Sequence, residues 1–248
     1  MLKILFVLFF VCFSVFASAS EYPKQEKWSF DGVFGRFDFA SIQRGFQVYK
    51  EVCSACHSVK RIAFRNLIDI GFSESEAKTI AAEYQITDGP NDDGEMFQRN
   101  GKLFDYLPGS YKNDNVAKAA NGGAIPPDLS LIIKARHDGA NYVYSLLTGY
   151  QNAPSDIMIG LGMHYNPYFA GMQIKMPPPL VADGQVSYQD GTQSTVDQMA
   201  RDVVNFLQWT AEPEMEKRKS IGLKVVIFLV IMTAVFYIAM KQIWSDIC

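Results

Sequence analysis

Residues that bind metal ions or form disulfides are scarce in this sequence. Its 248 residues include four cysteines and three histidines. Cys12 lies in an apolar N-terminal segment and Cys248 is the last residue, so Cys53 and Cys56 are the one close pair. A structural zinc site needs four ligands, and a disulfide-rich domain needs several cysteine pairs. The composition therefore argues against both classes.

The first twenty residues contain no arginine, which disfavours an amphipathic, arginine-rich mitochondrial presequence. Lys3 is followed by the apolar run Ile4–Phe16 and by Ala17-Ser18-Ala19, a small-residue cleavage pattern. The apolar run is short for a membrane span, although a retained N-terminal anchor is the alternative. We predict that residues 1–20 are a bacterial signal peptide and that the mature domain is periplasmic.

A strong charge excess is also missing. Residues 21–212 contain 23 Asp and Glu against 17 Lys and Arg. This mildly acidic balance disfavours nucleic acid as a partner and suits a basic protein, although solvation alone could explain it. No repeat or low-complexity tract is visible, and residues 21–214 are enough for one domain.

The pair Cys53 and Cys56 belongs to a motif that carries chemistry, because His57 follows directly. C-x-x-C-H is typical of a c-type haem attachment site. Two thiols on one helical turn can add to the two vinyl groups of a haem, and the adjacent imidazole can bind the iron as proximal ligand. The motif therefore predicts one covalently attached haem c.

Other interpretations of the motif are a thioredoxin-like redox pair, a zinc site and a simple Cys53–Cys56 disulfide. The redox pair expects a preceding strand in a βαβ unit. Here Ile42, Phe46 and Tyr49 recur at helical spacing before the motif. The context therefore favours haem.

The sixth iron ligand is best supplied by Met176. Three prolines follow it, and proline stiffens the chain, so the thioether loses little entropy on ligation. His/Met ligation suits electron transfer because it raises the haem potential. The competitors are Met172, Met163, Met158, His164 and His137.

Local patterns predict a mainly α-helical domain with long loops. Helices are expected over 40–56, 73–84, 140–147 and 195–211, with a short helix from Asp128 through Ala135. The Ser73/Glu76 pair predicts a capping box. We expect an exposed acidic loop at 87–94, a long functional loop at 151–180 and a small hairpin around 186–191.

The C-terminal region carries a long apolar run. Residues 221–240 contain one charge, Lys224, and twenty helical residues rise about 30 Å, one hydrocarbon thickness. We predict a membrane anchor at 215–243 and a cytoplasmic tail at 244–248. The basic residues before the span conflict with the positive-inside rule, but haem attachment outside the cytoplasm sets the orientation.

Longer stretches of the chain carry a family resemblance. They are Cys53–Ser58, Asp88–Phe97, Gly123–Ser130, Arg136–Tyr150, Tyr165–Leu180 and Phe206–Glu214. In this order they resemble the cytochrome c1 family, the haem-bearing subunits of quinol–cytochrome c reductase (respiratory complex III), from about Trp28 to Trp244. The resemblance implies a class I cytochrome c-like haem domain, mainly α, with long loop insertions and one C-terminal transmembrane helix.

This resemblance implies roles for individual residues. Haem thioethers would form at Cys53 and Cys56, with His57 and Met176 as axial ligands. Arg136 would pair with a haem propionate beside Tyr142, although an ordinary surface arginine is what the sequence alone suggests. The pocket would also be lined by Asn121, Ala124, Pro126 and Pro127.

The resemblance also implies partners and a place in the cell. Cytochrome b and the Rieske iron–sulfur subunit would be neighbours, and cytochrome c would accept the electron. The chain would be a single-pass protein of the bacterial inner membrane, acting as a redox subunit without a quinone site of its own. The alternative functions are a free membrane-tethered c-type cytochrome and a ligand-sensing or catalytic haem protein with an open sixth position.

Overall fold

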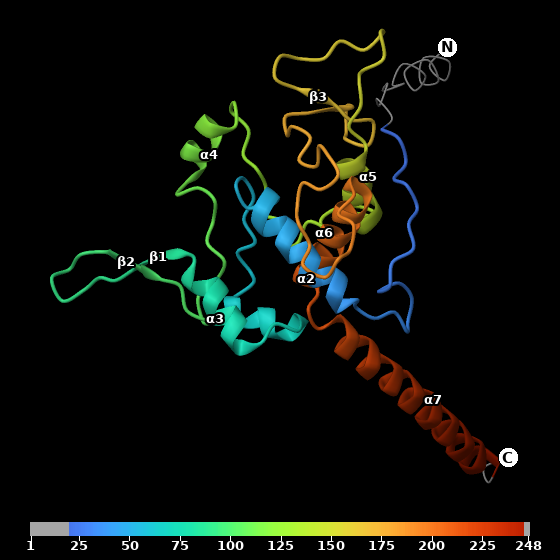
Figure 1. The fold of residues 1–248 in the computed structure, drawn as a ribbon. Coiled ribbons are helices and arrows are strands. Elements are labelled where there is room, and N and C mark those ends of the chain that lie inside the picture. Colours follow the sequence, from blue (N-terminus) through green and yellow to red (C-terminus); the bar gives the residue numbers. More distant parts are fainter. Residues whose placement is uncertain (1–19, 246–248) are drawn as a thin grey trace, which may run out of the picture.

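The computed structural model describes residues 20–245. Cys12, Cys248 and all but the last residue of the predicted signal peptide lie outside the described residues. The fold is mainly helical, with two small two-stranded sheets and a long C-terminal helix that leaves the domain (Figure 1). This agrees with the predicted fold class.

Helix α2 (Phe39–Val48) leads directly into the C-x-x-C-H motif. It begins where the Asp38 carboxylate accepts a hydrogen bond from the Ser41 N–H. It continues into a π-helical turn, Tyr49–Cys53, closed by the Ser54 N–H donating to the Tyr49 carbonyl. The helix predicted over 40–56 is thus confirmed to Cys53, with a turn after it. Such π-helical turns are frequent at functional sites.

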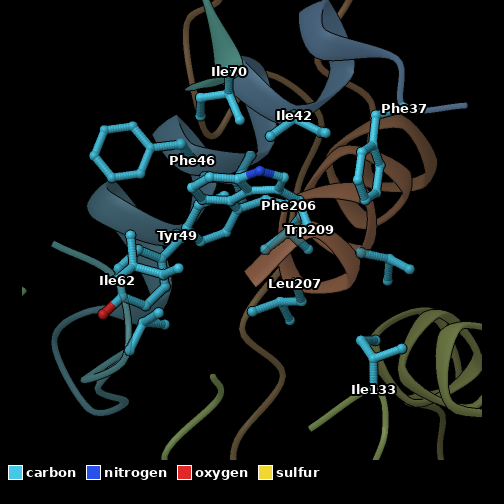
Figure 2. Close-up of a cluster of buried hydrophobic side chains, with 14 of the residues drawn as sticks. Phe37, Ile42, Phe46, Tyr49, Ile62, Ile70, Ile133, Phe206, Leu207 and Trp209 are labelled. Atoms are coloured by element: carbon cyan, nitrogen blue, oxygen red, sulfur yellow. The ribbon is translucent and has the colours of Figure 1, made fainter. Parts of the chain in front are cut away.

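Helix α6 (Val196–Ala211) packs across α2 and forms the centre of the core. Its predicted extent is confirmed, with Thr195 as N-cap. Phe206 of α6 lies 5.6 Å from Phe46 and 5.5 Å from Tyr49 between ring centroids, and Trp209 lies 5.9 Å from Phe206 (Figure 2). This aromatic cluster fixes the end of α2 that carries the motif.

Two further predicted helices are confirmed. Helix α3 (Glu74–Ala82) has the Ser73/Glu76 capping box, and α5 (Gly139–Thr148) ends at Gly149. The sequence analysis did not predict the 3₁₀ helix Phe64–Ile70 or helix α4 (Asp114–Ala120).

The predicted acidic loop is the tip of a hairpin that the sequence analysis missed. Strands β1 (Gln85–Asp88) and β2 (Phe97–Asn100) pair antiparallel, with Gln85 opposite Asn100. Residues 89–96 connect them and are exposed. A second pair, β3 (His164–Tyr165) with β4 (Gln173–Ile174), interrupts the long loop 151–180.

Two predicted elements are wrong. In place of the helix expected over 128–135, residues 130–134 form consecutive turns. The Asp128 carboxylate accepts hydrogen bonds from the Ser130 N–H and from Ser58 and Lys60, far earlier in the chain. No strand ladder forms at 186–191; a turn at Asp190 is present, and the loop is closed by one bond from Gly184 N–H to the Ser194 carbonyl.

Helix α7 (Met215–Ser245) joins the domain at its first turn and then projects away from it (Figure 1). Met215 is buried in the core. Within residues 20–245, α7 is the one helix long and apolar enough to cross a membrane. Its 31 residues rise about 46 Å, more than the hydrocarbon thickness.

Candidate functional site

The C-x-x-C-H motif forms one helical turn at the end of α2. The N–H groups of Cys56 and His57 both donate to the Cys53 carbonyl, at 3.1 and 2.8 Å. Both cysteines are free thiols, and a helix rather than a strand precedes them. The structure therefore favours neither the disulfide nor the thioredoxin interpretation. Among residues 20–245, no group of three or more His, Cys, Asp or Glu could hold a metal ion.

The Cys53 thiol sits in an apolar environment. Burial raises its pKa to about 12, with a smaller contribution from Cys56. At neutral pH the group is a protonated thiol packed against the core. It is thus held in place by packing against the hydrophobic core rather than by an ion pair.

The His57 ring is oriented by a hydrogen bond from one of its two nitrogens. Nδ1 lies 2.8 Å from the Pro127 carbonyl, and the Tyr49 hydroxyl donates to the His57 carbonyl at 3.1 Å. Burial lowers the pKa of His57, against the opposing influence of Pro127 and Asp128. The imidazole is therefore neutral, with Nδ1 as donor and Nε2 available as a ligand.

Asp128 fastens the segment that holds His57. Its carboxylate accepts from the Ser58 hydroxyl at 2.7 Å and from the Lys60 N–H at 3.0 Å. Burial acts to raise the pKa of Asp128, but the hydrogen bonds from Ser130, Ser58 and Lys60 outweigh it and lower the pKa. Asp128 thus stays ionised and links the motif to the Pro126–Pro127 segment.

Loop segments from distant parts of the chain approach the motif. The Ser110 hydroxyl donates to the Ser54 carbonyl at 2.7 Å, which brings residues 109–117 to the motif. Asn121 closes α4 and donates from its side chain to the Tyr111 hydroxyl at 3.0 Å and to the Ala117 carbonyl at 2.7 Å. Ala124 is half-buried three residues further on.

Hydrogen bonds also connect the segment after α4 and the residue Tyr150 to the Met176 segment. Lys175 Nζ donates to the Gly122 carbonyl, and the Tyr150 hydroxyl donates to the Met176 carbonyl at 3.0 Å. Burial raises the pKa of Tyr150, so its hydroxyl stays a donor. Gly122 bonds to Lys175, and Pro127, five residues later, bonds to His57. The segment 122–127 therefore links the His57 and Met176 segments.

The environments of the methionines differ. Met176 is half-buried, and its carbonyl is held by Tyr150 immediately before three prolines. The Met172 sulfur lies 4.0 Å from the Tyr165 hydroxyl, and this residue has a φ of 58° in a tight turn. Met158 is 89% exposed. The role of Met176 as the sixth ligand stays a prediction, which its constrained segment supports.

Arg136 and Tyr142 flank the start of α5. Arg136 is exposed, and its guanidinium donates to the Ala135 carbonyl. Within residues 20–245 the Arg136 guanidinium has this one hydrogen bond and no ion pair, so it is available to a carboxylate supplied by a ligand. Tyr142 is half-buried against the core, and its proximity to Tyr150 contributes to the raised pKa of that residue.

A polar cavity of about 490 Å³ lies beside the motif, between residues 109–117 and Ile125–Pro126. Its walls include neither the motif cysteines, nor His57, nor Met176. It is therefore not the space between the two axial candidates.

The donor set fits a covalently attached haem. Two free thiols, an oriented neutral imidazole and a stiffly held thioether are the groups that a His/Met-ligated haem c requires. The sequence analysis missed Tyr150, Lys175 and Asp128, which hold these groups. Tyr150 and Lys175 lie inside stretches that carried the resemblance, but no local pattern indicates their long-range partners.

Comparison with known proteins gives one consistent family. The sequence model described as "Cytochrome C1 family" matches residues 28–247. A cytochrome c1 of Rhodospirillum rubrum is 48% identical over 239 residues, covering 90% of this chain and 88% of that protein. The mitochondrial "Cytochrome c1 2, heme protein" of Arabidopsis thaliana is 50% identical over 244 residues, covering 94% and 77%.

A relative in Candida albicans, named "Cytochrome b-c1 complex catalytic subunit, mitochondrial", is 52% identical over 209 residues, covering 84% of this chain and 72% of that protein. The family match spans the motif, the helical domain and all of α7. The chain belongs to the cytochrome c1 family.

Proposed function

We propose that this chain is the electron-transfer subunit of a quinol–cytochrome c reductase. The family match over residues 28–247, together with the C-x-x-C-H turn and its oriented His57, carries this proposal. The chain carries one haem c, attached through Cys53 and Cys56. That group supplies the one-electron chemistry, and the protein supplies binding, orientation and electrostatics.

Three side chains of the chain would hold the haem. His57 would bind the iron through Nε2, because Nδ1 is engaged by the Pro127 carbonyl. Met176, in a segment fixed by Tyr150 and followed by three prolines, would supply the second iron ligand. Arg136 is exposed and would pair with a haem carboxylate.

The remaining predicted site residues would line the haem pocket. Tyr142 of α5 packs against the core, and Asn121 and Ala124 follow α4; we infer that all three line the haem pocket. Pro126 and Pro127 have no N–H, so they add carbonyl acceptors and apolar surface without unpaired donors.

Cytochrome b is the proposed first neighbour of this chain. One relative is named for the cytochrome b-c1 complex. Another, from Bradyrhizobium diazoefficiens, is named "Cytochrome b/c1", is 46% identical over 249 residues, and this chain covers 36% of its length. The longer relative therefore has room for a second part. We infer that the domain is periplasmic, that an iron–sulfur subunit delivers the electron and that a cytochrome c accepts it.

Purification of the full chain from mild-detergent extracts of its membranes tests the assembly. We expect a b-type cytochrome and an iron–sulfur protein to co-purify with the haem c chain. A haem c chain that migrates alone in the same extract would instead support the free tethered carrier.

The β1–β2 hairpin is proposed to attract the basic electron acceptor. Asp92 and Asp93 are exposed at its tip, near Glu95. Acidic surfaces raise association rates with basic partners in a salt-dependent way. Asp92→Lys, Asp93→Lys and the double variant should lower the second-order rate of cytochrome c reduction and flatten its dependence on ionic strength.

Asp156→Lys is the matched control, because Asp156 is also exposed but lies in the 151–180 loop. It should change the rate less than either single hairpin variant. An unchanged salt dependence in the double variant would exclude the hairpin from docking.

A further inference from the structure

The segment 28–37 buries three aromatic side chains and leaves two apolar ones in solvent. Trp28, Phe30 and Phe37 belong to the core. The ring centroid of Phe30 lies 5.6 Å from that of Trp28 and 6.5 Å from that of Phe37. Between them, Val33 is 63% exposed and Phe34 is 81% exposed. Exposed apolar side chains that are adjacent on a structured turn mark a contact site more often than scattered ones do.

The turn that presents these side chains is braced. The Arg36 N–H donates to the Ser29 carbonyl at 2.9 Å, and the Asp31 carboxylate accepts from the Trp28 N–H at 3.0 Å. Gly32 has a φ of 68°, and a Cβ at Gly35 would lie 2.1 Å from the Asp31 carbonyl oxygen. The sequence is thus specialised to hold this turn, which we call the Val33–Phe34 turn.

Helix α7 is fastened to the Val33–Phe34 turn. Lys219 Nζ donates to the Phe30 carbonyl at 2.6 Å and to the Gly35 carbonyl at 3.2 Å. The Phe37 N–H donates to the Glu216 carboxylate at 2.7 Å. Both ends of the turn are therefore bonded to the first turns of α7.

These bonds fix the level of the turn relative to the apolar part of α7. Lys219 lies two residues before Ile221, which is roughly 3 Å along the helix axis. In Figure 1 the loop before α2 lies beside the start of α7, and its tip extends toward the side on which α7 leaves the domain. The exposed pair therefore lies near the level at which the apolar run of α7 begins.

We propose that the Val33–Phe34 turn inserts into the lipid interface beside α7, as a second membrane contact of the haem domain. Phenylalanine and other large apolar side chains bury at the boundary between headgroups and acyl chains, and basic residues next to them are attracted to anionic headgroups. Arg36 is exposed on the same turn, and Lys217 is exposed on α7. This inference rests on the proposed membrane span by α7.

A second membrane contact would fix the orientation of the haem domain, which a single helix does not. A single helix anchors the domain but leaves it free to tilt at the junction. A second contact, bonded to α7 by Lys219 and Glu216, restricts that tilt and holds the haem domain at one angle to the membrane.

Nitroxide accessibility tests the proposal in the full haem-loaded chain. In a Cys248→Ser background, the variants Phe34→Cys and Val33→Cys are spin-labelled and reconstituted into nanodiscs of phosphatidylcholine and phosphatidylglycerol. Collision with oxygen, which concentrates in lipid, is compared with collision with a water-soluble nickel chelate. We expect both labels to show an oxygen-to-nickel ratio between those of two control positions.

The controls are Leu161→Cys and Val230→Cys. Leu161 is a fully exposed apolar residue in the 151–180 loop, and Val230 lies in the middle of the apolar run of α7. A ratio at position 34 equal to that at position 161 overturns the proposal. Low collision with both reagents overturns it too, because a protein surface would then cover the turn. A water-like ratio at position 230 would instead refute the span itself, so the two failures are distinguishable.

Discussion

Replacing Gly45 by alanine should disrupt the contact between α2 and α6 on which the haem motif depends. An added Cβ at this position would lie 1.9 Å from the Asp202 carbonyl oxygen and 2.8 Å from the Phe206 Cβ. Carbon and oxygen atoms in close contact are roughly 3.3–3.6 Å apart. The two helices would therefore have to separate by about 1.5 Å, and the aromatic cluster around Phe206 would move with them.

The size of the effect follows from this forced separation. Overpacking a tight core costs about 1–3 kcal/mol, occasionally more. Because the clash is with the backbone of a buried helix, we expect Gly45→Ala to lower the free energy of unfolding by about 3 kcal/mol. For a domain of this size, each kcal/mol shifts the melting temperature by about 2–4 °C, so the expected loss is about 6–12 °C.

The assay is loss of haem circular dichroism on heating the purified full chain in detergent. Gly222→Ala is the control, because a Cβ at Gly222, which is also helical, meets nothing within 4 Å. The control should melt with the unmodified chain or slightly above it. If Gly45→Ala melts within about 1 °C of the unmodified chain, the close α2–α6 crossing and its role in holding the motif are refuted.

The other predictions concern ligation, positioning and pH. Met176→Leu should let the reduced protein bind carbon monoxide and should lower the haem potential, while Met172→Leu should do neither; binding by the second variant alone would reverse the assignment. Tyr150→Phe should destabilise the chain by about 0.5–1.5 kcal/mol and speed displacement of the sixth ligand by imidazole, because the Met176 carbonyl loses its donor; equal displacement rates would contradict this. The Thr192 N–H and Arg44 lower the pKa of Asp190 to about 2, so its stabilising contribution is complete above the unfolded pKa of about 4 and disappears as the pH falls through 2. The melting difference between Asp190→Asn and the unmodified chain should therefore shrink over that range, and a constant difference would argue against the ion pair.

Elements specified by adjacent residues could be predicted from the sequence. Helix α3 is set by the Ser73 capping box, and α6 by Thr195 and an apolar stripe. The β1–β2 hairpin was missed because its four-residue strands are mostly exposed and show no apolar alternation. The helix expected at 128–135 is absent, and the Asp128 carboxylate accepts hydrogen bonds from Ser58 and Lys60. No local sequence pattern indicates these long-range bonds.

The candidate site likewise has local features that the sequence predicted and long-range contacts that it did not. The turn Cys53–His57 and the stiff segment after Met176 are local features, so the sequence identified them as a possible ligand set. Their assembly depends on the bonds from His57 to Pro127 and from Tyr150 to Met176, which join residues 70 and 26 positions apart. Such contacts are decided by packing, and a single sequence carries no direct signal for them.

Mass spectrometry of the denatured full chain tests the central claim most directly. Haem held by two thioether bonds stays on the polypeptide after unfolding and acid extraction. We expect the unmodified chain to carry the mass of one haem, and the double variant Cys53→Ser, Cys56→Ser to carry none. A haem-free mass for the unmodified chain, with the pigment recovered in the extract, would contradict the account.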